Sequence, residues 1–287
     1  MKVLILGKGF IGTDLFTYLF KRKIDVDIID KKTIDYTDRK TFFDFLKSTD
    51  HTTIINCSGY TGSPNVDACE SEKEKCLFYN VSVPVQINSI CEQQRRKFIN
   101  VSSGCIYTGY EKKFTEKDEP NFGIYNCDSS YYSFTKHLCE VSLANTDAIT
   151  LRIRMPFNSS LASKNLIYKI LKYDNIINLK NSGTNTNDLN VFIEKLINHE
   201  SFYSIRGPLN VVNPGHITGK MISEFLSFYG LVNNNWKIVD ISTLDIKAQR
   251  SNCVLSDKKI EKLRLQLPAI CTSLKETVAA FALNYKK

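Results

Sequence analysis

The sequence lacks any uninterrupted apolar run of the roughly 18 residues that a membrane-spanning helix requires. Its content of 43% hydrophobic and 24% charged residues is ordinary for a globular protein. The apolar opening, residues 1–6, runs directly into a glycine without the longer hydrophobic region and cleavage site of a secretory signal. We therefore expect a soluble, cytoplasmic protein that does not bind a membrane.

The sequence also lacks the patterns of metal sites and disulfide frameworks. It has only four histidines, and its cysteines form neither a Cys-x-x-Cys pair nor a group with nearby histidines. The nine cysteines stand at positions 57, 69, 76, 91, 105, 127, 139, 253 and 271. An odd number at irregular spacing indicates free thiols in a reducing compartment. We expect no bound metal.

A clustered basic surface is missing as well. The formal net charge is +8, but the lysines are spread along the chain instead of forming a stripe with interleaved aromatic residues. Nucleic-acid binding is therefore not expected. The positive charge favours anionic partners in general, including nucleotide cofactors and nucleotide sugars.

Apolar runs bounded by turn residues do alternate with helical patterns through the first half of the chain. This alternation predicts an α/β fold with a Rossmann-type, doubly wound parallel sheet, which binds its ligands at the carboxyl ends of its strands. Strands are expected at 3–6, 26–29, 54–57, 98–101 and 149–153, and helices at 11–20, 42–46, in two stretches after 57, and at 132–143.

Beyond about residue 156 the alternation loosens. Helices are expected near 165–172, 189–198, 217–229 and 268–283, with a short strand at 209–212. We predict a dinucleotide-binding domain over residues 1–155 and a smaller, mainly substrate-binding C-terminal lobe over residues 156–287, interleaved with the first. No linker rich in Pro, Gly or Ser separates the two parts, so we expect them to share an interface.

A glycine motif follows the first expected strand and opens the first expected helix. It reads Gly7-Lys8-Gly9-Phe10-Ile11-Gly12. Glycines at this spacing permit a tight turn, the approach of a pyrophosphate and close packing of helix on strand, while the helix N-terminus supplies free N–H groups. In this context the motif predicts a dinucleotide site.

Asp30 ends the second expected strand, where an acidic residue commonly binds the adenosine ribose and favours NAD. Lys31 and Lys32 follow directly. Two lysines can instead bind the 2′-phosphate of NADP, or simply belong to a solvated turn. The pattern leaves these alternatives open.

Tyr132 and Lys136 lie one helical turn apart, on one face of an expected helix. A nearby ammonium lowers the pKa of a tyrosine, which favours acid–base catalysis near neutral pH. The spacing alone is weak, because it recurs in the pairs Tyr36/Lys40 and Tyr168/Lys172. Only Tyr132 follows, by 29 residues, an expected strand that ends in hydroxyls, where Ser103 is placed to hydrogen-bond a substrate carbonyl.

Together, the glycine motif, Ser103, Tyr132 and Lys136 resemble the extended short-chain dehydrogenase/reductase superfamily. Three longer strings resemble one group within it, the nucleotide-rhamnose synthase/epimerase-reductases, which are related to dTDP-4-dehydrorhamnose reductase. The similarity runs from about residue 3 to 215. The strings are residues 56–70 (Asn-Cys-Ser-Gly-Tyr-Thr-Gly-Ser-Pro-Asn-Val-Asp-Ala-Cys-Glu), 103–107 (Ser-Gly-Cys-Ile-Tyr) and 151–156 (Leu-Arg-Ile-Arg-Met-Pro).

The resemblance implies an enzyme that inverts carbons 3 and 5 of UDP-4-keto-6-deoxy-D-glucose and reduces its carbon 4 ketone with NADPH, giving UDP-L-rhamnose. It further implies a separate 4,6-dehydratase as the source of the substrate, and a homodimer is possible. The glycine motif is one residue shorter than the Gly-x-x-Gly-x-x-Gly more common in this group, so NADH is a possible alternative cofactor.

The resemblance also implies roles for single residues. Tyr132 donates the proton to the carbon 4 oxygen, Lys136 tunes Tyr132 and binds the nicotinamide ribose, and Ser103 orients the ketone. Cys105 and Lys169 match the acid/base pair of the epimerase; without the resemblance, we would interpret them as an inert thiol and a solvated lysine. The predicted cofactor-binding residues are Gly7, Gly9, Phe10, Ile11, Gly12, Asp30, Lys31, Asn56, Ser58, Gly59, Tyr132 and Lys136, and the predicted substrate-binding residues are Ser103, Gly104, Cys105 and Asn158.

Two alternatives stay open. One is a reductase without epimerase activity that acts on a UDP- or dTDP-linked 4-keto-6-deoxy sugar. The other is a non-catalytic regulatory subunit that binds a dinucleotide and a partner protein. The intact set of Ser103, Tyr132 and Lys136 argues against the second, because such a subunit does not need them.

Overall fold

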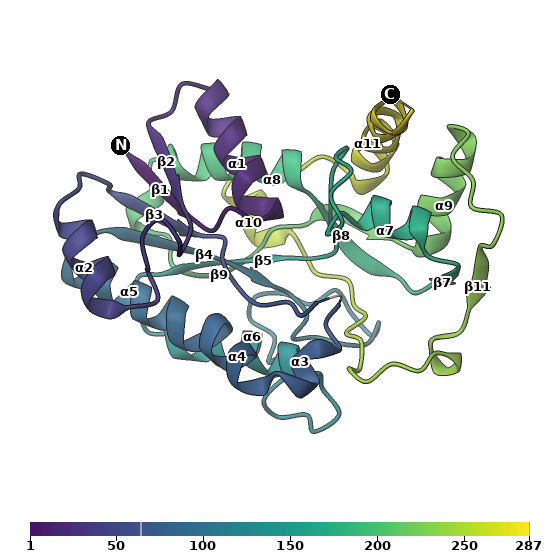
Figure 1. Ribbon diagram of the computed structural model, residues 1–287, viewed down its shortest axis with the longest axis horizontal. Helices are drawn as coiled ribbons and strands as arrows, with labels where there is room; N and C mark the ends of the chain where they lie inside the picture. The colour runs from purple at the N-terminus through teal and green to yellow at the C-terminus, as the bar shows by residue number, and fades with distance from the viewer. Residues whose placement is uncertain (64, 287) are drawn as a thin grey trace.

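A six-stranded, fully parallel sheet forms the centre of the computed structural model, which describes residues 1–63 and 65–286 (Figure 1). Pro64, part of the string 56–70, and Lys287 lie outside the described residues. The strand order is β2-β1-β3-β4-β5-β9, and the predicted doubly wound parallel sheet is confirmed. The strands are β1 (Val3–Leu6), β2 (Val26–Ile29), β3 (Thr53–Asn56), β4 (Lys97–Ser103), β5 (Ile149–Ile153) and β9 (Gly207–Asn210).

Helices cover both faces of this sheet, and the apolar strands supply both cores. Val3 and Ile5 of β1 pack into one core, and Leu4 and Leu6 pack into the other, because successive side chains of a strand point to opposite faces. Helices α1 (Phe10–Lys21), α8 (Thr186–Ile197) and α10 (Lys258–Lys262) cover the first face, and α2 (Arg39–Lys47), α5 (Val83–Gln93) and α6 (Tyr131–Leu143) cover the second (Figure 1).

The second half of the chain contributes to the main sheet through β9. The expected strand 209–212 begins two residues earlier, because β9 pairs with β5 from Ile149↔Gly207 to Arg152↔Asn210. Helix α8 also begins earlier than expected, since Asn185 caps it by accepting a hydrogen bond from the Asn187 amide. The two parts of the chain therefore share one sheet and one core.

The remainder of the second half forms a smaller lobe around its own apolar core. Its short strands were not predicted, because β8 reads Asn-Ser-Gly-Thr-Asn and has no apolar alternation. The lobe contains β6 (Pro156–Phe157), α7 (Leu166–Lys172), β7 (Asn175–Ile177), β8 (Asn181–Asn185), β10 (Asn213–Ile217), α9 (Gly219–Phe228), β11 (Lys237–Val239) and α11 (Ile270–Tyr285).

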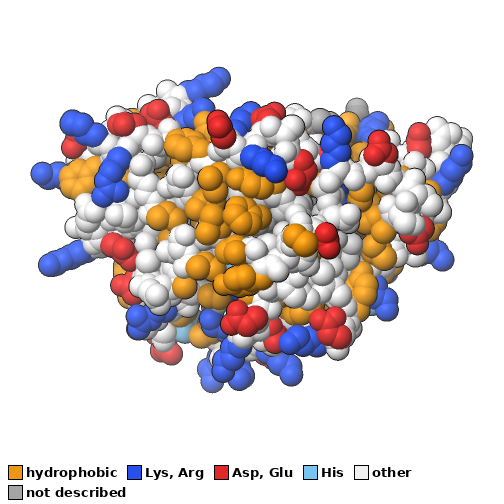
Figure 2. Space-filling model, turned by 90° about the horizontal axis from the view of Figure 1, so that it is seen from below, with side chains coloured by type: hydrophobic (Ala, Val, Ile, Leu, Met, Phe, Trp, Pro, Cys, Tyr) orange, Lys and Arg blue, Asp and Glu red, His pale blue; other side chains and the backbone are white. Residues whose placement is uncertain are grey.

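Short helices lie between β3 and α5 where the sequence predicted a helical stretch. These are α3 (Ala68–Ser71), α4 (Lys73–Leu77) and a π-helical turn (Phe78–Ser82) that continues into α5. Seen from below, hydrophobic side chains gather on the face that these helices, α5 and α6 form, and the basic side chains are dispersed around it (Figure 2). Phe78 of the π-helical turn and Val141 of α6 are exposed. Within the described ranges, no helix is both long and apolar enough to cross a membrane.

The strand order places a topological switch point between β1 and β3. The chain leaves β1 towards β2 on one side and returns on the other side at β3. In open parallel sheets, ligands bind in the crevice outside the carboxyl ends of such strands. The glycine motif after β1 and the segment after β3 meet there.

Candidate active site

Two glycines of the motif are required by the turn and by packing. Gly7 has a φ of +102°, a conformation that side chains rarely adopt, and a Cβ at this position would lie 3.0 Å from the amide nitrogen of Ser58. A Cβ at Gly12 would overlap the carbonyl oxygen of Gly7. These glycines therefore allow the turn after β1 and the close contact of α1 with it.

The middle glycine faces open space. Apart from its neighbours in the chain, no atom of the described residues lies within 4 Å of the position that a Cβ of Gly9 would take. Gly9 is the N-cap residue of α1, no side chain caps this end, and the first turn contains no acidic residue. The first amides of the helix, from Phe10 and Ile11, are thus available to an anion such as a pyrophosphate.

Asp30 organises the turn that follows β2. Its Oδ1 atom accepts hydrogen bonds from the Thr33 hydroxyl and amide, both at 3.0 Å, and from the Lys32 amide at 3.1 Å. These bonds, those from Thr33 first, hold the pKa of Asp30 below its ordinary value. Lys31 donates to the hydroxyl of Tyr79 at 2.7 Å. Binding of the adenosine ribose by Asp30 and binding of a 2′-phosphate by Lys31 therefore both stay predictions.

The segment after β3 is held by asparagine side chains. Asn56 donates to Asn100 Oδ1 at 2.9 Å, and its own Oδ1 accepts from the amide of Ser58 at 3.1 Å. At Gly59 a Cβ would lie 3.5 Å from the Nζ atom of Lys136. The glycine thus leaves room for this ammonium beside the loop.

Ser103, Tyr132 and Lys136 come together at the carboxyl end of β4. Ser130 caps α6 by accepting a hydrogen bond from the Ser133 amide at 3.1 Å, which starts the helix directly before Tyr132. The Nζ atom of Lys136 lies 5.5 Å from the centre of the Tyr132 ring. The Ser103 hydroxyl lies near enough to the Tyr132 phenol to lower its pKa. The three residues of the predicted catalytic set therefore share one place.

The pKa of Tyr132 differs from the sequence-based expectation. Desolvation of the phenol raises this pKa well above 10.0, the neighbouring thiol of Cys105 raises it further, and the Ser103 hydroxyl lowers it. The expected lowering by a nearby ammonium is outweighed, because burial penalises the phenolate. In this state the phenol is protonated at neutral pH, as a proton donor must be.

Cys105 belongs to the same group of residues, whereas Lys169 comes from the lobe. The Cys105 side chain is 7% exposed, and its amide donates to the Ser103 hydroxyl at 3.3 Å. Lys169 is half-buried on α7; burial first, and then the charge of Lys164, lower its pKa below 10.5. Among the described contacts none joins Lys169 to Cys105.

Two predicted substrate-binding residues have structural contacts instead. A Cβ at Gly104 would overlap the Leu255 side chain, so the absence of a side chain allows this packing. Asn158 is buried; its Nδ2 atom donates to Thr186 Oγ1 and its Oδ1 atom accepts from the Ser160 amide, both at 2.9 Å. These contacts explain both residues without a ligand, and binding of substrate by either stays a prediction.

Sequence analysis missed Asn80, which connects the loop after β3 to α6, the helix of the predicted catalytic residues. Its side chain accepts from the Tyr60 amide at 2.9 Å and donates to the Tyr60 carbonyl at 2.8 Å and to Thr135 at 3.2 Å. Thr135 directly precedes Lys136. No motif marks Asn80, since only the fold brings residues 60, 80 and 135 together.

A second missed feature links the lobe to the dinucleotide end of the molecule. Arg250 pairs with Asp67 at 2.9 Å, and the Ala248 amide donates to the same Asp67 oxygen at 2.9 Å. The segment around residue 250 thereby crosses from the lobe to the loop after β3. Across the described ranges, no group of three or more His, Cys, Asp and Glu side chains is placed to hold a metal ion.

These features define the class of the protein: a Rossmann-type α/β molecule with a glycine motif, a serine and a tyrosine–lysine pair at the carboxyl edge of its sheet. The match of the sequence to a family profile shows the family of the chain. The profile of the RmlD substrate binding domain matches residues 1–283, and the chain belongs to this family.

Two plant relatives cover most of the chain. A trifunctional UDP-glucose 4,6-dehydratase/UDP-4-keto-6-deoxy-D-glucose 3,5-epimerase/UDP-4-keto-L-rhamnose-reductase from Arabidopsis thaliana is 30% identical over 308 residues, covering 100% of this chain. The chain spans only 42% of the length of that relative. A bifunctional dTDP-4-dehydrorhamnose 3,5-epimerase/dTDP-4-dehydrorhamnose reductase, also from Arabidopsis thaliana, is 30% identical and aligns with 87% of this chain and 82% of its own length.

Solved structures share the whole architecture. A UDP-rhamnose synthase from Acanthamoeba polyphaga mimivirus superposes with a TM-score of 0.85 at 26% identity, covering 98% of this chain and 99% of its own. A dTDP-4-dehydrorhamnose reductase from Bacillus anthracis, solved in complex with NADP, has a TM-score of 0.83 at 20% identity, covering 99% and 100%. The second similarity shows the common fold alone.

Proposed function

We propose that this protein is an NADPH-dependent reductase of a nucleotide-linked 4-keto-6-deoxy sugar. The carrying observation is the meeting of Ser103, Tyr132 and Lys136 at the carboxyl end of β4. The uncapped N-terminus of α1 at the same edge supports dinucleotide binding. Both plant relatives carry a keto-rhamnose reductase activity in their names, which supports the choice of substrate class.

In the proposed reduction, Tyr132, Ser103 and Lys136 have different roles. NADPH, when bound, would supply the hydride for carbon 4. Tyr132 donates its proton to the carbon 4 oxygen, so that a ketone, a hydride and a proton give an alcohol. Ser103 orients this oxygen as a second hydrogen-bond donor, placed where negative charge develops. Lys136, whose ammonium lies against Gly59, stabilises the phenolate left on Tyr132.

Cofactor binding is assigned to the two loops at the switch point. The amides of Phe10 and Ile11 would hold the pyrophosphate beside Gly9, and Asn56, Ser58 and Gly59 would hold the remainder of the cofactor from the loop after β3. Asp30 and Lys31 bind the adenosine end. We expect NADPH, and NADH is the alternative because the acidic residue Asp30 directly follows β2.

A second activity, epimerisation at carbons 3 and 5, belongs to the same proposal. Protons at these carbons are α to the ketone, so the enolate formed on their removal has the donors Tyr132 and Ser103 at its oxygen. Cys105 lies beside Tyr132, and burial depresses the pKa of Lys169, which suits a base. The names of both plant relatives include a 3,5-epimerase.

The substrate we propose is UDP-4-keto-6-deoxy-D-glucose, with UDP-L-rhamnose as product. The name of the mimivirus structure and that of the trifunctional plant relative support the uridine nucleotide. The dehydratase activity named for the trifunctional relative has to come from another protein or segment, because the described ranges contain a single Rossmann-type sheet. The hydrophobic face of Figure 2 is a candidate contact for the proposed homodimer.

The proposal is tested by incubating the purified protein with UDP-4-keto-6-deoxyglucose in deuterated water, with and without NADPH. Proton NMR follows carbons 3 and 5, and absorbance follows the nicotinamide. Exchange at both carbons without cofactor, and UDP-L-rhamnose with it, is the expected result. Oxidation of NADPH without exchange would leave a reductase that requires a separate epimerase.

A chain that neither exchanges protons nor oxidises NADPH would contradict the proposal. The same assay with the dTDP-linked substrate then separates a wrong nucleotide from a wrong function. Silence with both substrates, together with retained NADPH binding in a fluorescence titration, would favour the regulatory alternative.

A further inference from the structure

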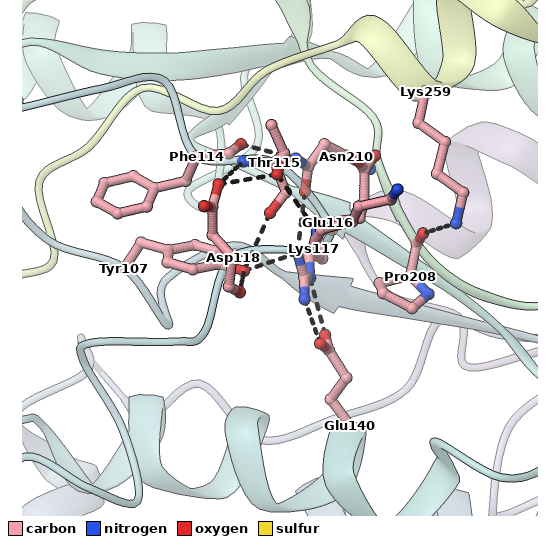
Figure 3. A network of polar contacts seen from close by, with 11 residues as sticks. Tyr107, Phe114, Thr115, Glu116, Lys117, Asp118, Glu140, Pro208, Asn210 and Lys259 are labelled. Atoms are coloured by element: carbon pink, nitrogen blue, oxygen red, sulfur yellow. Dashed lines mark hydrogen bonds and ion pairs between the residues drawn. The ribbon is translucent and has the colours of Figure 1, made fainter.

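The catalytic helix α6 is attached to the sheet by a buried ion pair. Arg152 of β5 is 2% exposed, and its Nε atom donates to an oxygen of Glu140 at 2.9 Å. Its Nη2 atom donates to the other oxygen of the same carboxylate, so the pair is bidentate. Figure 3 shows the Glu140 side chain extending from its helix towards this network. A bidentate guanidinium–carboxylate pair fixes geometry as well as distance.

Both partners stand next to catalytic residues. Glu140 follows Lys136 by four residues and Tyr132 by eight, which places it one and two turns along the same helix. Arg152 pairs in register with Ser102 of β4, directly beside the pairing of Ser103 with Ile153. The ion pair thus connects the helix that carries Tyr132 to the strand beside the one that carries Ser103.

The guanidinium is itself held from its other side. Its Nη1 atom donates to the hydroxyl of Tyr107 at 3.1 Å, and that hydroxyl donates to the Asp118 carbonyl at 2.8 Å. Nη1 also lies 3.4 Å from Asn210 Oδ1, and the amide of Asn210 donates to Glu116 at 2.8 Å. The loop 107–118 and strand β9 therefore keep Arg152 in one position. Figure 3 shows Tyr107, Asp118 and Asn210 of this network.

We infer that Glu140 and Arg152 are positioning residues, which set the place of the Tyr132 hydroxyl relative to Ser103 and thereby the rate of proton donation to the ketone. The N-cap Ser130 holds the first turn of α6, and Glu140 holds its third, so rotation or sliding of the helix is prevented at two points. This inference rests on the proposed reductase function. A displacement of about 1 Å at a reacting group costs on the order of a hundredfold in rate.

The first test replaces Glu140 by Gln, which keeps the shape and one acceptor oxygen and removes the charge. We expect kcat to fall about 10- to 100-fold, while the KM values for NADPH and for the keto sugar change by less than about threefold. A loss of folded protein alone would scale the apparent kcat by the folded fraction, which circular dichroism measures. A kcat per folded molecule equal to that of the parent would overturn the inference.

A matched control is Glu194→Gln. Glu194 is also a helical carboxylate paired with an arginine, Arg22 at 3.1 Å, and with a tyrosine hydroxyl, Tyr18 at 2.5 Å, but it lies on α8 and not on the catalytic helix. We expect its kcat to remain within about twofold of the parent value. An equal fall in both variants would assign the effect to general stability and contradict positioning.

The double variant Glu140→Leu/Arg152→Met provides the test if the single variant Glu140→Gln fails to fold. Removing one partner leaves a buried charge, whereas replacing both with apolar side chains removes this penalty. We expect the thermal midpoint to recover and kcat to stay low, with a pH–rate profile that differs from the parent because the position of Tyr132 relative to Ser103 has changed. Recovery of kcat together with the midpoint would make the pair purely structural. An inactive parent would contradict the proposed function instead, so the two failures are distinguishable.

Discussion

Two tyrosine–lysine pairs in this molecule have the same internal geometry and different surroundings. On α6, the Nζ atom of Lys136 lies 5.5 Å from the Tyr132 ring centre, and on α7 that of Lys172 lies 5.5 Å from the Tyr168 ring centre. Helical spacing produces both contacts. The local motif therefore does not distinguish the proposed catalytic pair from a surface pair.

The difference lies in what each pair meets. Ser103 and Cys105 lie near enough to Tyr132 to shift the pKa of its phenol, and Lys136 is 7% exposed beside the loop after β3. Lys172 is exposed on α7 and donates to the hydroxyl of Tyr285 at 3.0 Å. This contact raises the pKa of Lys172. Only the α6 pair has a strand end, a hydroxyl and a glycine loop around it.

The third pair with this spacing shows that an interval of four residues does not always bring the two side chains onto one helical face. Tyr36 precedes α2, and Lys40 lies within α2 and pairs with Asp44 at 2.8 Å. The two residues are therefore not on one helical face. The same interval has three outcomes because the helix boundaries and the neighbouring elements differ.

The largest expected effect separates the two tyrosines. We expect Tyr132→Phe to lower the reductase kcat on the order of a thousandfold, because it removes the proton donor. Tyr168→Phe should retain the parent kcat. Nicotinamide absorbance measures both rates, and circular dichroism confirms that both variants are folded. Equal rates for the two variants would remove the distinction between the pairs.

The lysines should differ next. Lys136→Met is expected to lower kcat on the order of a hundredfold and to raise the KM for NADPH, because the ammonium that lies by Gly59 and Tyr132 is lost. Lys172→Met should leave both parameters unchanged. Steady-state kinetics at varied NADPH concentration tests this. A similar rise of KM in the Lys172 variant would imply that α7 contributes to the cofactor site.

A smaller effect distinguishes two lysines of one helix by their pH dependence. Burial lowers the pKa of Lys169, whereas the Tyr285 contact raises that of Lys172. If Lys169 is the base of the proposed epimerase, deuterium exchange should rise with pH and level off below 10.5, the ordinary pKa of lysine. NMR exchange rates across this range provide the measurement. The inflection should vanish in Lys169→Met and persist in Lys172→Met.

The smallest expected effect concerns stability. A lysine whose pKa is lowered on folding destabilises the fold while it is charged, and this penalty disappears as the pH rises from the folded pKa towards 10.5. Lys169→Met should therefore raise the urea midpoint slightly at neutral pH, and less so near pH 10.5. Lys172→Met should show no such trend. A lower midpoint for Lys169→Met at neutral pH would assign that ammonium a stabilising contact.

Much of the main sheet could be predicted because its strands are buried on both faces. Residues 3–6 read as a continuous apolar segment and residues 149–153 as apolar residues alternating with Thr150 and Arg152, and their boundaries agree with β1 and β5. The strands of the lobe are short and polar, as β8 illustrates, and were missed. Their positions depend on partners such as β10, which follow much later in the chain.

The candidate site was predictable only in part. Ser103, Tyr132 and Lys136 were found because each follows a strand or lies on a helix that the pattern marks. The direction of the Tyr132 pKa shift was predicted wrongly, since desolvation is a property of the folded surroundings. The contacts of Asn80 and the ion pair of Asp67 with Arg250 could not be predicted from the sequence, because the partners are distant along the chain.

The sequence by itself determined the α/β alternation, the glycine turn and the tyrosine–lysine spacing, because periodicity and backbone freedom are local properties of the chain. Only the tertiary structure decided which tyrosine meets a serine, how the phenol titrates and what anchors its helix. Glu140 and Arg152 illustrate this last point: no sequence pattern pairs these two residues, twelve positions apart, and they form a buried ion pair only once α6 packs on β5. Burial, charge pairing and hydrogen-bond direction arise between elements, and they are therefore set by packing.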